Sequence, residues 1–297
     1  MDKWRDIPVL ILGFNRPLLL QGIIAQSSLR DFNKVIISID GPRDGNSIDK
    51  QANKEIRELL DQSDFESRFS MTNQGSYAVT SAITAVLAEF PAVIVVEDDL
   101  RVAPNALRSI SEQLSSLDSK IATVSGYSPN VLINSFAFSN SWRQSNYFCP
   151  WVWGTTRKVW SKYKQEIDSQ DLAQLVQSPS WNQLNAANQS KWFLRFLWCV
   201  NNPNVTWDFQ MQFLHFRESM VSIRPWKSLV TNHGFNSQGQ RTQNEPIWNP
   251  RISREGEVKN STFRLNGVSN LIDSLTFAAD HQLIDSKLHK MVRKLYR

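Results

Sequence analysis

The chain has 297 residues, of which 41% are hydrophobic and 21% charged, as is typical of a soluble globular protein. No apolar run reaches the roughly 18 residues of a bilayer span, and the start MDKWRDIPVL lacks the apolar core of a signal peptide, so we expect a cytoplasmic protein. The formal charge of +5 favours anionic partners without identifying them. Cys149 and Cys199 form no CxxC pair or disulfide framework, and we expect both to be buried free thiols.

Strand and helix patterns alternate over the first half of the chain. Four short apolar runs predict buried strands, at residues 7–12, 34–39, 92–96 and 121–124. Helical spacing of apolar residues predicts helices over 17–24 and 75–90, and Ala103-Pro104 begins another. This order indicates an α/β fold with a doubly wound, mainly parallel sheet flanked by helices.

The second half differs in composition. From about Trp142 the sequence is rich in Trp, Asn, Gln and Ser, and its hydrophobic period is weaker. No low-complexity linker or repeat separates the two halves. We therefore interpret the second half as a Trp-rich elaboration of the same fold.

The stretch VIVVEDDL, residues 93–100, leads a buried strand directly into three carboxylates. Glu97, Asp98 and Asp99 fall where this strand should emerge, and ligands of open α/β sheets bind outside the carboxyl ends of the strands. Adjacent carboxylates repel one another and resist burial, so the cluster needs a compensating charge. A hard cation such as Mn²⁺ or Mg²⁺, shared with a phosphorylated ligand, would supply it. The alternative is a solvated acidic turn.

Several segments together resemble GT-A-fold glycosyltransferases, in particular the group related to N-acetylglucosaminyltransferase I and a set of bacterial sugar transferases. IVVEDDLRVAPNAL is similar to their metal-binding region, in which the strand ends in an EDD form of the DxD motif. Further segments agree in order along the chain: PVLILGFNRP, IISIDG, NQGSYAVTSAI, NYFCPWVWGTTRKVW, TWDFQ and IRPWKSLVTNHGF. The resemblance covers roughly residues 7–242 and implies a GT-A-like sheet.

The resemblance implies roles for the acidic residues. Asp99 looks like the direct metal ligand, Asp98 like the residue that faces the ribose and the metal shell, and Glu97 like one that approaches the donor sugar.

Three residues from other segments resemble contacts to the donor nucleotide. Arg16 follows the first strand, Asp40 ends IISID, and Asn73 precedes a helix. The carboxylate of Asp40 can accept the imide N–H of a uracil or thymine ring. Each residue also has a simpler interpretation: a surface guanidinium for Arg16, an Asp-Gly turn for Asp40, and a helix cap for Asn73.

Glycosyl transfer also needs a base for the acceptor hydroxyl. Asp208, in VTWDFQ, resembles the Trp-Asp base position of the family, and Glu218 is a weaker alternative. Asp208 could instead be an ordinary helix N-cap. His233 departs from the family pattern and is either an additional metal ligand, a contact to phosphate or acceptor, or a structural residue.

Aromatic residues cluster in the segment NYFCPWVWGTTRKVW. They could stack on sugar, and we expect at least two of the five to belong to the core instead. The five residues are Tyr147, Phe148, Trp151, Trp153 and Trp160. The neighbouring Arg157 suits either a diphosphate, an acidic acceptor or an ordinary surface position.

The resemblance implies a metal-dependent glycosyltransferase that moves a sugar from a UDP-sugar to a hydroxyl of a glycan or lipid-linked acceptor, with inversion, in polysaccharide assembly. Residues 1–140 would bind the nucleotide sugar, residues 141–245 would bind the acceptor, and 246–297 would form an extension. A nucleotidyltransferase is the first alternative, although GFNRP has a single glycine where such enzymes carry a Gly-rich loop. A non-catalytic carbohydrate-binding protein is the second alternative. The dispersed positive charge argues against nucleic-acid binding.

The C-terminal segment HQLIDSKLHKMVRKLYR has apolar residues at helical spacing and five Lys or Arg residues. This pattern is typical of a basic amphipathic helix on an anionic membrane surface, which would place the protein peripherally on the inner membrane face. The alternative is a C-terminal helix packed on its own domain with a basic outer face.

Overall fold

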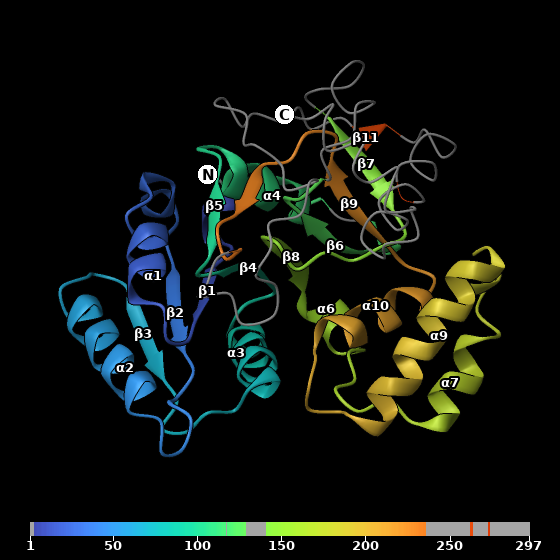
Figure 1. The fold of residues 1–297 in the computed structure, drawn as a ribbon. Helices are drawn as coiled ribbons and strands as arrows, with labels where there is room; N and C mark the ends of the chain where they lie inside the picture. Colours follow the sequence, from blue (N-terminus) through green and yellow to red (C-terminus); the bar gives the residue numbers. More distant parts are fainter. Residues whose placement is uncertain (1–2, 117, 129–140, 236–261, 264–272, 274–297) are drawn as a thin grey trace, which may run out of the picture.

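The computed structural model describes residues 3–116, 118–128, 141–235, 262–263 and 273. Within them, a nine-stranded mixed sheet forms the centre of the molecule (Figure 1). Its parallel part contains β1 (Val9–Gly13), β2 (Val35–Ile39), β3 (Glu66–Phe69) and β4 (Ala92–Glu97), in the spatial order β3-β2-β1-β4. The chain runs outward from β1 to β3 and returns to the other side of β1 as β4. A ligand crevice is expected where the strand order reverses, outside the carboxyl ends of β1 and β4.

Helices cover both faces of this parallel part. α1 (Pro17–Ile24) follows β1, α2 (Ser47–Leu60) follows β2, and α3 (Ser76–Glu89) follows β3. α1 and α2 pack in one core cluster with one set of alternating strand residues, which includes Ile11. α3 packs in a second cluster with the opposite set, which includes Leu10. The doubly wound, mainly parallel α/β arrangement is therefore confirmed.

The second half of the chain extends the same sheet. β8 (Trp153–Thr156) lies antiparallel between β4 and β6 (Ile121–Ser125). Beyond β6 follow β9 (Val221–Pro225), β7 (Trp142–Ser145) and β11 (Thr262–Phe263). The two halves thus share one sheet, and β11 brings part of the C-terminal extension into it by pairing parallel with β7.

A small two-stranded sheet lies beside the acidic strand end. β5 (Leu100–Val102) begins directly after the EDD tripeptide and pairs antiparallel with β10 (Val230–Asn232). Asn232 stands opposite Leu100 in this pairing. The pairing therefore carries the residues after Asn232 to the acidic cluster.

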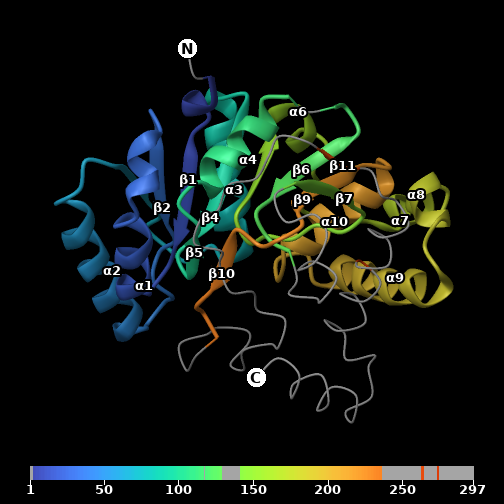
Figure 2. The ribbon, with the colours of Figure 1, turned by 90° about the horizontal axis from the view of Figure 1, so that it is seen from above.

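The structure describes further helices in both halves of the chain. They are η1 (Lys3–Asp6), η2 (Ser27–Asp31), α4 (Ala106–Leu114), α6 (Arg157–Trp160), α7 (Ser169–Leu175), α8 (Pro179–Asn182), α9 (Ala186–Asn201) and α10 (Asp208–Arg217). α7, α8, α9 and α10 share an aromatic core cluster that includes Trp192 and Phe196. This helical group and the pair α1 and α2 lie at opposite ends of the molecule (Figure 2). In the part of the chain that the structure describes, no helix combines the length and apolarity needed to cross a bilayer.

Candidate functional site

A cavity of about 580 Å³ opens at the carboxyl ends of β1, β2 and β4. Gly13 ends β1, Asp40 follows β2, and Glu97 ends β4, so one side of the cavity is built from adjacent strand ends. The second half of the chain forms the other side. Its lining residues are Pro150, Trp151, Asn204, Val205, Trp207, Asp208, Asn232, Gly234 and Phe235. All the predicted site residues except His233 line this cavity.

The aspartates of the EDD tripeptide are buried and paired with Arg16. Asp98 is 1% exposed and Asp99 is 8% exposed. Arg16 Nη1 donates to Asp99 Oδ2 at 2.9 Å, and Arg16 Nη2 forms a close ion pair with Asp98 Oδ1. The guanidinium thus supplies the positive charge that adjacent carboxylates require. Arg16 lies inside the site and is not a surface residue.

Burial also changes the acidity of this cluster. Burial raises the pKa of Asp98 to about 6, and the charge of Asp99 adds to the rise while Arg16 opposes it. The pKa of Glu97 is raised as well, first by burial and then by the charges of Asp99 and Asp98. Asp208 contributes to the same rise. Carboxylates from both halves of the chain therefore share one electrostatic environment.

The cluster offers carboxylate oxygens of the kind that divalent cations take as ligands. Asp99 Oδ1 is buried, and no described group donates a hydrogen bond to it. A Cβ on Gly234 would lie 2.3 Å from Asp99 Oδ2, so any residue other than glycine at this position would clash with the carboxylate. Mg²⁺ and Mn²⁺ take oxygen ligands, usually one or two carboxylates completed by substrate phosphates. Among the described residues no group of three or more His, Cys, Asp or Glu side chains is arranged to hold a metal. A cation at Asp98 and Asp99 would therefore need further ligands, which the phosphates of a bound substrate could supply.

His233 meets the cluster through its backbone. Its N–H donates to the carbonyl oxygen of Asp99 at 2.8 Å, while its side chain is exposed and does not line the cavity. The side chain of Asn232 accepts from the N–H of Gly234 at 2.6 Å and fixes this turn. Metal binding by the His233 imidazole stays a prediction.

Asp40 holds the loop that contains Asn73. Its carboxylate accepts from the N–H groups of Gly41 and Gln74 at 2.9 Å, of Gly75 at 3.1 Å, and from Asn73 Nδ2 at 2.8 Å. A carboxylate has about four lone-pair sites, so these donors use its whole capacity. Burial raises the pKa of Asp40, and the backbone N–H groups oppose the rise. A direct contact from Asp40 to a base stays a prediction and would require one of these donors to leave.

The same contacts orient Asn73. Its Nδ2 donates to Asp40 Oδ2 and also to the carbonyl oxygen of Gly41 at 3.2 Å, so both amide hydrogens are used. Its Oδ1 is thereby turned away from these two acceptors. The helix-cap interpretation is wrong, because the N-cap of α3 is Gly75, which has no side chain and lies two residues further along the chain.

Asp49 is a supporting residue that the sequence did not indicate. It lies in the first turn of α2, where its buried carboxylate accepts from Arg43 Nε at 2.6 Å, from Arg43 Nη2 at 2.9 Å and from Asn15 Nδ2 at 2.8 Å. The Arg43 guanidinium lies 5.5 Å from the ring centroid of Phe14, and both residues line the cavity. Asp49 therefore fixes the loops after β1 and β2 relative to each other.

Replacing Asp49 with Asn should destabilise the protein by about 1–2 kcal/mol at pH 7, because it removes charged hydrogen bonds to Arg43. Hydrogen bonds from Arg43 lower the pKa of Asp49 to about 2, against an ordinary value near 4 in the unfolded chain. Its contribution is thus complete above about pH 4 and is lost as the pH falls toward 2. Urea unfolding of both proteins at pH 7 and pH 3 should give a smaller difference at pH 3. An equal difference at both pH values would contradict this role.

Asp208 is the first residue of α10 and lines the cavity. The N-cap of this helix is Trp207, so the interpretation of Asp208 as the N-cap is wrong. Glu218 follows the other end of α10, about 15 Å away along the helix axis, where it pairs with Lys162 at 2.6 Å. The structure thus brings Asp208, and not Glu218, to the acidic strand end.

The aromatic segment divides between core and cavity. Trp153 and Trp160 are buried core residues, Phe148 packs beside them and Tyr147 packs on the helical core, which confirms that at least two of the five belong to the core. Of the five, only Trp151 lines the cavity.

An unusual backbone conformation accompanies this division. Val152 has φ 47°, in the left-handed region that is strongly disfavoured for a β-branched residue. Its carbonyl oxygen accepts from the N–H of Gly126 at 2.7 Å, which helps to hold the turn. The turn places Trp151 at the cavity while Trp153 enters the core.

Cys149 and Cys199 are buried free thiols, as expected.

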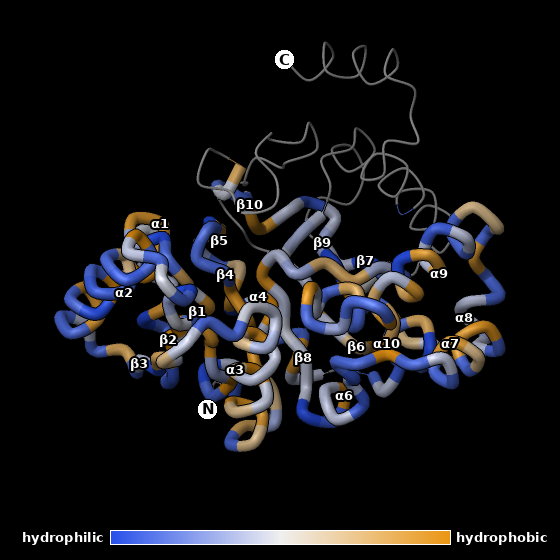
Figure 3. The backbone as a smooth tube through the Cα atoms, turned by 60° about the horizontal axis from the view of Figure 1, so that its bottom comes forward, coloured by the Kyte–Doolittle hydropathy of each residue, from blue (hydrophilic) through white to orange (hydrophobic). Residues whose placement is uncertain are grey.

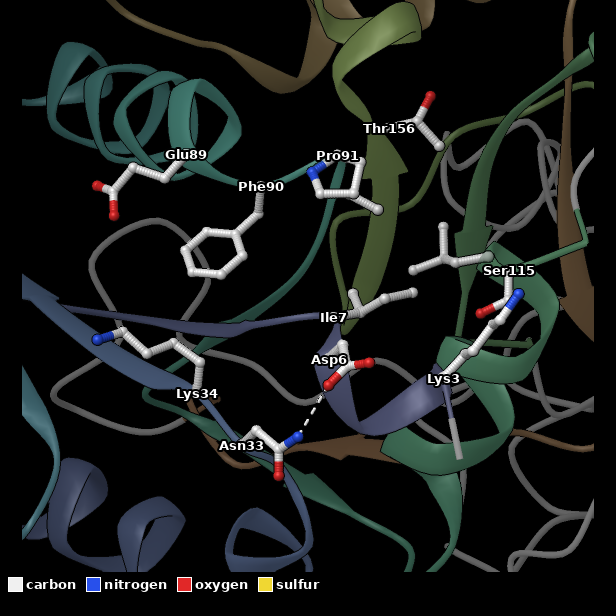
Figure 4. Close-up of a pocket in the computed structure, with 12 residues that line it drawn as sticks. Lys3, Asp6, Ile7, Asn33, Lys34, Glu89, Phe90, Pro91, Ser115 and Thr156 are labelled. Carbon is white, nitrogen blue, oxygen red and sulfur yellow. Dashed lines mark hydrogen bonds between the residues drawn. The ribbon is translucent and has the colours of Figure 1, made fainter. Parts of the chain in front are cut away.

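A larger cavity of about 730 Å³ lies at the amino ends of the central strands (Figure 4). Asp6 and Asn33, joined by a hydrogen bond of 2.8 Å, line it where β1 and β2 begin. It lies far from the acidic cluster, at the strand ends that do not bind ligands in open α/β sheets. We therefore place the functional site in the smaller cavity. Arg157 lies near the larger one and donates to carbonyl oxygens at the C-terminus of α3, so its contacts are structural.

Comparisons with known proteins give only distant likenesses. No family model matches the sequence, and no curated protein matches it. The structure is similar to a nucleotidyl transferase from Methanothermobacter thermautotroptrophicus, with TM-score 0.40 and 8% identity over 74% of this chain and 87% of that chain. For the inositol-1-phosphate CTP transferase from T. maritima the TM-score is 0.28, with 12% identity over 53% of this chain and 73% of that chain. For the glycosyltransferase GlyE of Streptococcus pneumoniae TIGR4 the TM-score is 0.33, with 15% identity over 78% of this chain and 56% of that chain. Likenesses of this size do not decide an activity.

Proposed function

We propose that this chain is a metal-dependent glycosyltransferase that moves a sugar from a UDP-sugar to a hydroxyl of a glycan or lipid-linked acceptor. The main support is the composition of one cavity at the carboxyl ends of β1, β2 and β4. Arg16, the acidic end of β4 and Asp208 meet there, although they come from three distant segments. A cation site, a phosphate-binding guanidinium and a carboxylate base are the groups that transfer from a nucleotide diphosphate requires.

In this proposal the strand end binds the donor diphosphate. Asp99, with Asp98 beside it, would hold Mn²⁺ or Mg²⁺. When bound, the cation offsets the charge that develops on the departing diphosphate. Arg16, which is paired with both aspartates in the free protein, can then bind a phosphate oxygen. Glu97 is placed to meet the donor sugar.

Asp208 acts on the acceptor. It accepts the proton of the attacking hydroxyl as the bond from the acceptor oxygen to the anomeric carbon forms and the bond from that carbon to the diphosphate breaks. A direct displacement of this kind inverts the anomeric centre. Trp151, also on the cavity wall, can pack against the face of a sugar ring.

Asn73 would read the donor base. Both of its amide hydrogens donate to Asp40 and Gly41, so its Oδ1 is the group that remains to accept the imide N–H of uracil. Cytosine has an acceptor at the same ring position and would be rejected.

Isothermal titration with UDP and N3-methyl-UDP tests this reading of the base. Wild-type protein should bind N3-methyl-UDP about tenfold or more weakly than UDP, because one hydrogen bond is lost and the methyl group would cover Asn73 Oδ1 without replacing that bond. Asn73→Ala should bind the two nucleotides almost equally. A preference for UDP that survives in the variant would assign the recognition to another group.

A donor screen with two product assays tests the function itself. UDP-sugars are incubated with Mn²⁺ and candidate acceptors, and UDP release is measured. Nucleoside triphosphates with sugar 1-phosphates are incubated in parallel, and pyrophosphate release is measured. The proposal expects UDP. Pyrophosphate would establish the nucleotidyltransferase alternative, and sugar binding without either product would indicate a non-catalytic carbohydrate-binding protein.

A further inference from the structure

An apolar surface lies on α9 and the loop that follows it. Leu194, Leu197 and Trp198 are 65%, 41% and 40% exposed, and Val205 is 47% exposed. The first three are spaced at i, i+3 and i+4 and therefore share one side of the helix. We call these four residues the α9 face. α9 lies at the edge of the molecule in Figures 1 and 2, and Figure 3 shows hydrophobic and hydrophilic residues alternating along it.

The charged residues on α9 itself have one sign. No Asp or Glu occurs between Asp171 and Asp208, whereas Lys191 and Arg195 lie on α9 itself. The Arg195 guanidinium is 4.9 Å from the ring centroids of both Trp192 and Phe209, which holds it against the helix. A helix with exposed apolar side chains, a tryptophan among them, and with cations as its charged residues has the composition of helices that lie in the headgroup region of an anionic bilayer.

The α9 face is continuous with the candidate site. Val205 belongs to the face and also lines the cavity. The Trp198 ring lies 6.5 Å from the ring of Phe209, which directly follows Asp208 in α10. A surface that covers the α9 face therefore lies beside the cavity wall that carries Asp208.

We propose that the α9 face docks this protein on an anionic lipid surface. Four partly exposed side chains offer far less than the roughly 800 Å² per partner of a standard protein interface, so a second copy or a folded partner is poorly matched. The C-terminal segment 281–297 is basic, like Lys191 and Arg195, so its charge does not complement that of α9. An anionic bilayer complements the charge and needs no minimum interface area.

This docking would define the acceptor class. If the proposed glycosyl transfer is correct, an enzyme lying on the bilayer through α9 presents Asp208 near the headgroups. A hydroxyl of a lipid-linked glycan is then the acceptor that it can reach. The lipid contact itself does not depend on the transfer activity.

Vesicle sedimentation of the full chain tests the docking. Binding is measured with vesicles of phosphatidylcholine alone and with about 30% phosphatidylglycerol, at low and at physiological salt. Wild-type protein should bind only the anionic vesicles and should bind more weakly as salt rises. The double variant Leu194→Gln, Trp198→Gln should bind at least about tenfold more weakly, since it loses two inserted apolar side chains. Lys191→Gln should weaken binding about fivefold.

The matched control is Ile48→Gln, Met71→Gln, which removes two apolar side chains of 76% and 85% exposure from another part of the surface. It should bind vesicles like wild type. Both double variants should retain the wild-type affinity for UDP, and the α9 variant should melt at a lower temperature but remain folded in the assay, because the partly buried Trp198 ring packs near Phe209. Wild-type protein that ignores anionic vesicles at low salt would overturn the proposal, and so would unchanged binding by the α9 variant. Vesicle binding without any nucleotide binding would instead refute the proposed glycosyl transfer and leave the docking intact.

Discussion

Replacing Asp99 with Asn is expected to lower kcat by about three decades while leaving the fold nearly intact, because a divalent cation supplies several kcal/mol at the leaving group. Asp99 has one buried oxygen without a hydrogen-bond donor among the described residues and one that accepts from Arg16. An amide keeps the shape of this side chain but offers a single, neutral oxygen. Steady-state rates across a Mn²⁺ titration, together with the melting temperature, measure both parts of the expectation.

The control for this variant is Asp61→Asn, which neutralises an exposed carboxylate after α2. It should leave both kcat and the dependence on Mn²⁺ unchanged. The cation site is refuted if Asp99→Asn turns over at a near-normal rate in metal-free buffer. A large fall in melting temperature for Asp99→Asn alone would instead indicate a structural carboxylate.

Replacing Asp208 with Asn is expected to lower kcat by about two to four decades with little change in donor affinity. An amide cannot take the proton of the attacking hydroxyl, whereas the proposed contacts to the diphosphate at the end of β4 are unchanged. Single-turnover rates and titration of UDP separate these two quantities.

Glu218→Gln is the matched control, because Glu218 follows the opposite end of the same helix. It should retain kcat and lose only the ion pairs with Lys162 and Arg217. If Asp208→Asn loses turnover and donor affinity equally, Asp208 contacts the nucleotide and does not act on the acceptor. A loss of stability without a kinetic defect would make it a helix-end residue.

The parts of the fold that the sequence predicts are those whose burial is local. α1 occupies residues 17–24 as expected, and β4 extends the expected strand by one residue, to Glu97. Such a strand is buried on both faces and therefore appears as a continuous apolar run. The acidic end of β4 stands out because its charge interrupts that run.

Other elements have no comparable pattern of apolar residues in the sequence. No element was predicted between Gly41 and Gln74, where α2 and β3 lie. β3 has the sequence ESRF and forms one edge of the described sheet, so it needs no apolar run. Because α2 was not predicted, Asp49 was not recognised as the residue that joins two loops of the cavity.

Strand pairings between segments far apart in the chain are also not predicted from the sequence. β8 inserts antiparallel between β4 and β6, and β10 pairs with β5 across more than a hundred residues. Neither partner is identifiable from a local pattern. The approach of Gly234 to Asp99 depends on the second of these pairings and became visible only in three dimensions. The predicted C-terminal helix lies outside the described residues.

The pairing of Arg16 with Asp98 and Asp99 means that the polypeptide carries its own counter-ion. The chain can therefore fold this strand end without dissolved metal, and chelating divalent cations is not expected to unfold the protein. If the strand end binds Mn²⁺ or Mg²⁺ as proposed, that ion would take the place of the guanidinium. Arg16 would then need a new anion, so the metal and the nucleotide diphosphate would be expected to bind together.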